Sequence, residues 1–202
     1  MVAATLAARD MTLALAITAD YGQRAAGPEI KAARRVAAAL GIPIETIHLP
    51  WVGRASTSAL TSPHRPLPHP DSADLAGPAA TGSAAAVWVP NRNGLLVNVA
   101  AVYAEAMDCG AIVAGFNAEE AATFPDNSPE FVDATNAALA LSTRSAVRVV
   151  SPTLGMSKTE IVQAGRLARA PLQYVWSCYD GGPTPCGRCE SCCRLQRAMD
   201  EA

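Results

Sequence analysis

The sequence predicts an α/β fold in which a parallel sheet carries helices on both faces, followed by a metal-binding segment at the C-terminal end. Apolar runs of strand length alternate with helical segments, and polar loops follow the strands at 20–24, 117–127 and 151–158. A cluster of cysteines lies near the end of the chain. Such alternation builds parallel sheets, and their ligands lie beyond the carboxyl ends of the strands.

The length and charge of the chain limit the number of domains and the classes of partner to expect. A chain of 202 residues, half of them apolar, can bury one sizeable core, and we expect a single domain. The 16 basic residues nearly balance the 18 acidic ones, which gives no electrostatic case for nucleic acid or membrane surfaces. The sequence contains no apolar run long enough to span a bilayer and no signal peptide pattern, so we expect a cytoplasmic protein.

The first half of the chain begins with a helix over 2–9 and a buried strand over 12–19. Pro28 suits the start of the next helix, which runs over 29–40 and stops at Gly41. A strand over 42–49 follows. This order is typical of one strand–helix–strand unit.

From 53 to 86 the chain is rich in Ser, Thr, Pro and Gly, which favours a long mobile insertion. Three leucines could anchor it to a core: Leu60, Leu67 and Leu75. His64 and His69 lie in proline-rich surroundings, and we expect them to be solvated and without a role.

The second half continues the alternation. Strands are predicted over 111–116 and 147–150, and helices over 129–141 and from Ser157 to about Arg169. Asn93 is predicted to cap an earlier helix, whose buried face would carry Leu95, Val99, Val102 and Ala106.

The loops after the strands contain groups that could hold a polar ligand. The 117–127 loop could direct several hydrogen-bonding groups at one ligand, although an ordinary polar loop would look the same. Ser157 and Glu160 are spaced as a capping box, which leaves Lys158 unexplained at a helix start, where the dipole disfavours a cation. Lys158 therefore faces either an anion such as phosphate or the solvent.

Five of the six cysteines fall between residues 178 and 193. Four are spaced to bind one ion: Cys178, Cys186, Cys189 and Cys192. Four thiolates suit tetrahedral zinc, and a filled coordination shell makes such a site structural. An iron–sulfur cluster is the alternative, but the Cys-Pro that often follows C-x2-C-x2-C is absent. Cys193 is the spare cysteine, and Cys109 is expected to serve packing.

These motifs together resemble the 7-cyano-7-deazaguanine synthases of the PP-loop ATPase superfamily, which act in the queuosine and archaeosine pathways. The resemblance covers most of the chain and rests on DYGQR, VPNRNGLL, GFNAEEAATFPDNSPEFV, SKTEI and WSCYDGG with PCGRCESC. It implies a Rossmann-like fold of the adenine nucleotide alpha hydrolase type. The predicted domain covers 1–175, with a zinc-binding segment of the same domain over 176–202.

The resemblance also implies an activity. A 7-carboxy-7-deazaguanine would be converted with ammonia and ATP, with Mg, into the nitrile 7-cyano-7-deazaguanine (preQ0), by way of an adenylated carboxylate and an amide. One structural zinc per chain would bind the four cysteines named above. The predicted catalytic residues are Arg92, Asp126 and Lys158, and those expected to bind nucleotide or deazapurine are Tyr21, Gln23, Arg24, Asn93 and Asn117. A homodimer is among the assemblies that the sequence allows.

Three features depart from the family. The Ser-Gly-Gly-x-Asp-Ser loop that cradles ATP phosphates is absent, and we expect a chain truncated at its start or a gene remnant, so family and activity are separate predictions. Ala25 replaces a frequent histidine, and the 53–86 insertion is long.

Two other functions fit the same residues. One is a different PP-loop adenylating enzyme that modifies tRNA, which the balanced charge disfavours. The other is a zinc-stapled domain that binds a partner without ATP chemistry.

Overall fold

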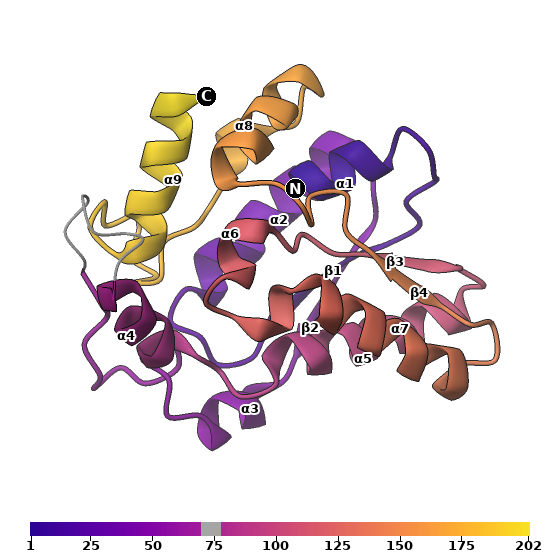
Figure 1. The fold of residues 1–202 in the computed structure, drawn as a ribbon, viewed down its shortest axis with the longest axis horizontal. Helices are drawn as coiled ribbons and strands as arrows, with labels where there is room; N and C mark the ends of the chain where they lie inside the picture. Colours follow the sequence, from indigo (N-terminus) through magenta and orange to yellow (C-terminus); the bar gives the residue numbers. More distant parts are fainter. Residues whose placement is uncertain (70–77) are drawn as a thin grey trace. The chain divides into compact units, whose positions relative to one another are not determined.

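The computed structural model describes residues 1–69 and 78–202, which group into two compact units. One unit, here unit 1, comprises 1–14 and 91–170, and unit 2 comprises 15–90 and 171–202. Each unit combines one pair of parallel strands with helices (Figure 1). The predicted α/β class is therefore confirmed, whereas the division at residue 175 stays a prediction.

Unit 2 is built on the strand–helix–strand order that the sequence predicted. Strand β1 (Ala16–Asp20) pairs in parallel with β2 (Ile44–His48), so that Ala16 lies opposite Ile44 and Asp20 opposite His48. Helix α2 (Ala26–Leu40) connects the strands and ends at Gly41, whose φ of 67° is the left-handed conformation that glycine adopts without strain. The predicted helix stop is confirmed.

The predicted insertion contains more regular structure than the sequence suggested. Helices α3 (Pro50–Ala55) and α4 (Pro78–Val87) lie at its two ends. The run of alanines before Val87 has high helix propensity, which the composition of the whole segment concealed. Among the predicted anchors, Leu60 and Leu67 are buried, as expected, and Leu75 lies outside the described residues. His64 and His69 are exposed.

The end of the chain returns to unit 2 through a short 3-10 helix, η2 (Leu172–Tyr174), and helix α9 (Glu190–Glu201). The guanidinium of Arg35 on α2 lies 5.9 Å from the ring centre of Tyr174, a cation–π contact that holds the returning segment. Helix α9 was not predicted. Its buried residues are Glu190, Cys192, Arg194 and Ala198, two of which are charged, so the sequence shows no apolar stripe that would indicate a helix.

In unit 1, β3 (Ala111–Val113) pairs in parallel with β4 (Arg148–Val150). The helices of this unit are α1 (Val2–Ala7), α5 (Arg92–Ala106), α6 (Ala118–Ala121), α7 (Pro129–Ser142), α8 (Lys158–Leu167) and the 3-10 helix η1 (Pro125–Asn127). Helices α1 and α8 contact each other, and α5 and α7 contact the strands (Figure 1). The buried core consists of Val97, Ala101, Phe116, Val132, Leu139 and Val149.

Helix α5 buries a different set of residues from the one that was predicted. Among the predicted residues, Val102 is 67 % exposed and Ala106 is exposed, while Leu95 and Val99 are half-buried. Val97 and Ala101 lie in the core instead. Apolar residues occur all round this helix, so their spacing does not define one face. The N-cap is Asn91, not Asn93, and Asn93 is buried in the first turn.

Two further predictions about the strands need correction. The segment 12–19 was expected to form a fully buried strand, but β1 begins at Ala16 and its residues are only half-buried. Among the described residues, each strand has a strand partner along one edge only. Such a strand is more accessible to solvent than a strand in the centre of a sheet.

No helix in the described part of the chain has the length and apolar character needed to cross a membrane.

Candidate active site and metal centre

The polar loops that follow β3 and β4 are held together by hydrogen bonds within unit 1. The N–H of Ala118 donates to the carbonyl of Met156 at 3.0 Å. The hydroxyls of Ser151 and Thr153 both donate to the carbonyl of Phe116, at 3.0 and 2.8 Å. Parallel strands end at the same edge of a sheet, which explains why the loops meet. Two of the three loops predicted to bind ligand are thus neighbours.

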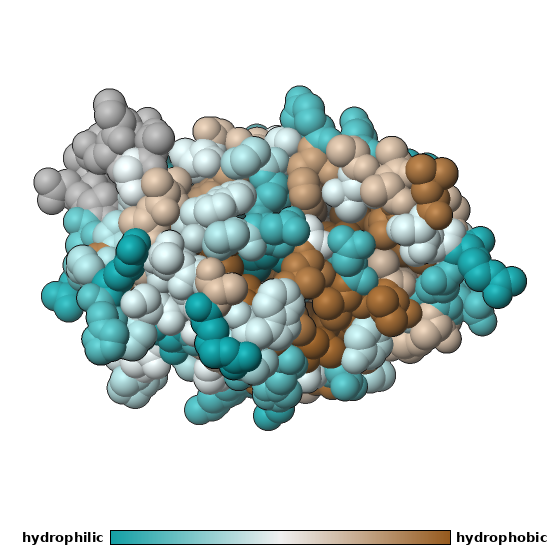
Figure 2. Space-filling model, turned by 90° about the horizontal axis from the view of Figure 1, so that it is seen from below, coloured by the Kyte–Doolittle hydropathy of each residue, from teal (hydrophilic) through white to brown (hydrophobic). Residues whose placement is uncertain are grey.

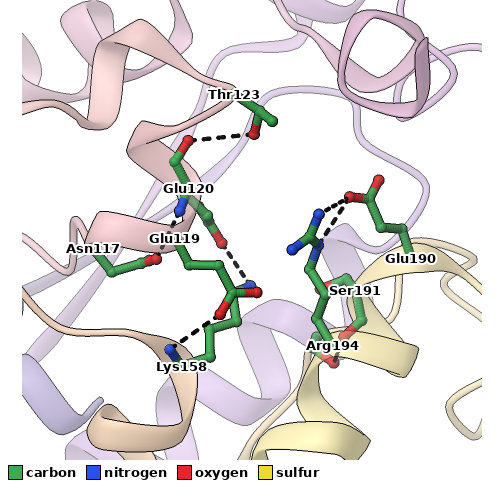
Figure 3. A network of polar contacts seen from close by, with 9 residues as sticks. Asn117, Glu119, Glu120, Thr123, Lys158, Glu190, Ser191 and Arg194 are labelled. Atoms are coloured by element: carbon green, nitrogen blue, oxygen red, sulfur yellow. Dashed lines mark hydrogen bonds and ion pairs between the residues drawn. The ribbon is translucent and has the colours of Figure 1, made fainter. Parts of the chain in front are cut away.

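Lys158 lies at the centre of this junction (Figure 3). Its Nζ is 2.7 Å from Oε1 of Glu120, and its backbone N–H donates to Oε2 of Glu119 at 3.3 Å. The predicted capping box of Ser157 and Glu160 is present, with both reciprocal hydrogen bonds. The positive end of the α8 dipole is therefore matched by carboxylates, and the Lys158 ammonium is paired with one.

Asn117 is buried, and its side-chain oxygen accepts the N–H of Glu120 at 3.0 Å (Figure 3). It is the N-cap of α6, a role that the sequence did not assign to it. This cap sets the direction of α6 and so places Glu119 and Glu120 at the start of α8.

Arg92, Asn93 and Asp126 meet in a second cluster of unit 1. Nε of Arg92 donates to the side-chain oxygen of Asn93 at 3.2 Å, and the Asn93 amide donates to the carbonyl of Asp126 at 3.2 Å. Burial raises the pKa of the Asp126 carboxyl, and this effect outweighs the opposing attraction of the Arg92 guanidinium. A partly desolvated carboxylate beside an arginine is typical of a ligand-binding site.

Tyr21, Gln23 and Arg24 belong to unit 2 and are engaged there. The buried Gln23 accepts the N–H of Tyr21 at 2.9 Å and donates to the carboxylate of Glu29 at 2.8 Å. The Arg24 guanidinium donates to the carbonyl oxygens of Ser62 and Arg65. The first loop is thereby tied to the insertion, and its predicted binding role stays a prediction.

Four cysteines of unit 2 converge at the metal centre, as their spacing predicted: Cys178, Cys186, Cys189 and Cys192. Their sulfur atoms all lie within 4.8 Å of one another, and three of the four residues are buried. A tetrahedral ion with Zn–S bonds of about 2.3 Å places its sulfur ligands about 3.8 Å apart. The donor set therefore fits zinc. A zinc ion bound by all four sulfur atoms would have a filled coordination shell and no open position for a substrate.

Backbone groups around the cluster favour thiolates. Sγ of Cys178 accepts the N–H groups of Asp180 and Cys186, at 3.4 and 3.3 Å. Burial opposes ionisation of Cys186, but N–H groups of Arg188 and Cys189 outweigh it and lower the pKa of this thiol to about 7. Burial raises the pKa of Cys189 and Cys192, as expected for thiols that need a cation to ionise.

Several residues that organise these sites had no predicted role. Glu119 and Glu120 were noted only as members of a polar loop. Glu190 and Arg194 form a buried ion pair on α9, with Nη2 of Arg194 2.8 Å from Oε1 of Glu190 (Figure 3). Their spacing of four residues would have indicated the pair, had a helix been expected there.

Comparisons with known proteins agree with the motifs. The family model described as "Queuosine biosynthesis protein QueC" matches residues 1–202. A 7-cyano-7-deazaguanine synthase of Desulforudis audaxviator is 52% identical over 195 residues, covering 96% of this chain and 88% of the relative. The enzyme of the same name from Pelotomaculum thermopropionicum is 49% identical (93% and 86% covered), and that from Methanosarcina barkeri is 44% identical (99% and 88% covered).

Proposed function

The chain belongs to the QueC family of queuosine biosynthesis proteins, and on that premise we propose that it is an ATP-dependent ligase that makes 7-cyano-7-deazaguanine. The substrates would be 7-carboxy-7-deazaguanine, ammonia and ATP with Mg. The chain is similar along most of its length to proteins named 7-cyano-7-deazaguanine synthase, one of them 52% identical, and this is the observation that carries the proposal.

The reaction must replace both carboxyl oxygens by one nitrogen. Adenylation of the carboxylate releases pyrophosphate, and ammonia then displaces AMP to form an amide. Removal of the amide oxygen needs a second activation, because loss of water from an amide is unfavourable in water. The site must therefore stabilise phosphate charge and hold a flat, hydrogen-bonding heterocycle.

The residues of unit 1 offer these two properties. We assign Arg92 and Lys158 to the phosphate charge that develops during adenylation, and Asn117, Asn93 and Asp126 to the deazapurine or nucleotide. The pair between Lys158 and Glu120 supports this assignment, since an ammonium held by a carboxylate is already placed to exchange it for a phosphate oxygen. Tyr21, Gln23 and Arg24 are assigned to nucleotide binding.

The cysteine centre is assigned a structural zinc, one per chain. The ion would be held by Cys178, Cys186, Cys189 and Cys192, which leaves it without a place for substrate. The ion would neutralise the thiolates and link the start of α9 to the segment around Cys178.

Two further assignments concern the setting of the enzyme. We assign it to the cytoplasm, where reduced cysteines remain free to bind metal. A homodimer is supported by exposed apolar side chains such as Val102 and Leu141, which is 92 % exposed. Figure 2 shows an apolar area on the face drawn there, and surfaces of this kind often mark protein contacts.

The decisive experiment incubates the purified, zinc-loaded chain with 7-carboxy-7-deazaguanine, ammonium and ATP, and follows the products by mass spectrometry. We expect amide and nitrile, with AMP and pyrophosphate, and no product when ATP or ammonium is omitted. Folded, zinc-loaded protein that forms neither amide nor nitrile would contradict the proposal.

A further inference from the structure

Four segments of unit 2 that lie far apart in the sequence contact one another in a closed ring. They are the metal-binding segment 178–192, helix α4, the insertion segment 58–65 and the loop 20–25. Each segment contacts the next, and the loop contacts the metal-binding segment again. We call this arrangement the contact ring.

The metal-binding segment holds α4 through a buried carboxylate. The hydroxyl of Ser83 donates to Oε2 of Glu190 at 2.6 Å, and both side chains are buried. The other oxygen of Glu190 accepts Nε of Arg194 at 2.9 Å (Figure 3). Glu190 directly follows the ligand Cys189, so its position depends on the cysteine cluster.

Helix α4 in turn holds the insertion, and the insertion holds the loop. The N–H of Ala59 donates to the carbonyl of Ala86 at 2.8 Å. Leu60 follows Ala59, and its carbonyl accepts the N–H of Arg24 at 2.8 Å. The Arg24 guanidinium also donates to the carbonyl of Ser62. Two backbone hydrogen bonds thus connect α4 to the loop that carries the predicted nucleotide-binding residues.

Gly181 closes the ring. It lies three residues after Cys178 with φ of 74°, and a Cβ on it would overlap the carbonyl oxygen of Arg24. Only glycine allows the metal-binding segment to approach the loop this closely. Ala25, the next residue of the loop, is 2 % exposed.

We propose that Glu190 is a positioning residue, which couples the metal centre through α4 and the insertion to the loop bearing Tyr21, Gln23 and Arg24. A buried ion pair contributes little net stability, and an apolar pair of the same volume would often serve as well. A carboxylate does what an apolar side chain would not, because it holds Ser83 and Arg194 at the same time. This inference rests on the proposed zinc centre but not on catalysis.

The test is hydrogen exchange, resolved by NMR at the amides of Ala59 and Arg24 in zinc-loaded protein. These two amides report the two backbone bonds of the contact ring. Ser83→Ala should accelerate exchange at both by about tenfold or more, the factor that corresponds to losing a hydrogen bond to a charged group. Glu190→Gln should act in the same direction, and Ser83→Thr, which keeps the hydroxyl, should restore slow exchange.

Two variants serve as controls. Ser177→Ala removes a hydroxyl that donates to the carbonyl of Ser191 near the metal centre without reaching α4. Asp200→Asn changes an exposed carboxylate on α9. Neither should alter exchange at Ala59 or Arg24. The amide of Ile42, bonded to the carbonyl of Ala37 at 2.9 Å, is the internal reference and should keep its rate in every variant.

The exchange rates and the zinc content test the contact ring and the metal assignment separately. Unchanged exchange at Ala59 and Arg24 in both Ser83→Ala and Glu190→Gln would overturn the proposal, as would equal acceleration at Ile42, because that indicates general destabilisation. Zinc content is measured on the same samples. Protein without bound zinc would contradict the metal assignment, which is a failure distinct from that of the contact ring.

Discussion

The Nζ atom of Lys158 lies 2.7 Å from Oε1 of Glu120, so a cation at the start of α8 is paired with a carboxylate of α6. A lysine at a helix N-terminus opposes the helix dipole, and the carboxylates of Glu119 and Glu160 on nearby backbone N–H groups offset that cost. The Glu120 carboxylate also keeps the Lys158 ammonium in place. A phosphate that replaces Glu120 would meet a preorganised cation.

Replacing Lys158 should impair catalysis far more than folding. For Lys158→Ala we expect kcat/KM to fall by about 10²–10³-fold, since preorganised charge stabilisation is lost. The free energy of unfolding should change by only about 0–1 kcal/mol, because the ion pair is partly exposed. Steady-state kinetics measure kcat/KM, and urea unfolding measures the free energy of unfolding. Lys31→Ala, on an exposed position of α2, is the control and should behave as the parent. Unchanged turnover of Lys158→Ala would remove the residue from the mechanism.

The Asp126 carboxylate should lower the stability of the folded chain at neutral pH and be required for activity. Burial raises its pKa in the folded chain above the unfolded value of about 3.9, so ionisation costs free energy only when the chain is folded. This cost is absent below the unfolded pKa and complete above the folded pKa. Asp126→Asn should therefore equal the parent in stability at low pH, exceed it at neutral pH, and lose activity.

Urea unfolding at a series of pH values checks this expectation. Asp133→Asn, at an exposed position on α7, is the matched control. An advantage of Asp126→Asn that grows as the pH falls would have the opposite sign and would exclude a raised pKa.

The four clustered cysteines should differ sharply from the other two. Cys178→Ser should abolish stoichiometric zinc binding, because a hydroxyl replaces a buried thiolate ligand. Cys193→Ser and Cys109→Ser should keep about one zinc per chain. Metal analysis by mass spectrometry and thermal unfolding provide the measurements. Loss of zinc from Cys193→Ser, with retention in Cys192→Ser, would exchange the roles of these neighbours; iron in place of zinc would overturn the metal assignment.

The capping box at α8 should stabilise unit 1. Ser157→Ala removes the side-chain acceptor for the N–H of Glu160 at 3.2 Å, and should lower the free energy of unfolding by about 1 kcal/mol. The urea midpoint reports the change. Ser145→Ala, on an exposed turn, is the matched control. An equal midpoint for Ser157→Ala and the parent would show that Glu119 and Glu160 suffice to cap the helix.

Local signals in the sequence predicted much of the fold. The glycine at 41 marked the end of α2, the Ser157 and Glu160 spacing marked the start of α8, and the cysteine spacing marked the metal centre. Each depends on residues that are close in the sequence, of which the cysteines from Cys178 to Cys192 are the most widely spread. The buried side of α5 was predicted wrongly, because apolar residues surround that helix and only its packing partners choose the face.

The sequence by itself determined the family, the alternation of strands and helices, the polar loops after the strands and the cluster of four cysteines. Only the tertiary structure decided the partners of these groups: Glu120 for Lys158, Asp126 for Asn93, and Ser83 for Glu190. The physical reason is distance along the chain. Spacing reveals interactions within a few residues, whereas a contact between segments separated by 33 to 107 positions exists only once the chain has folded.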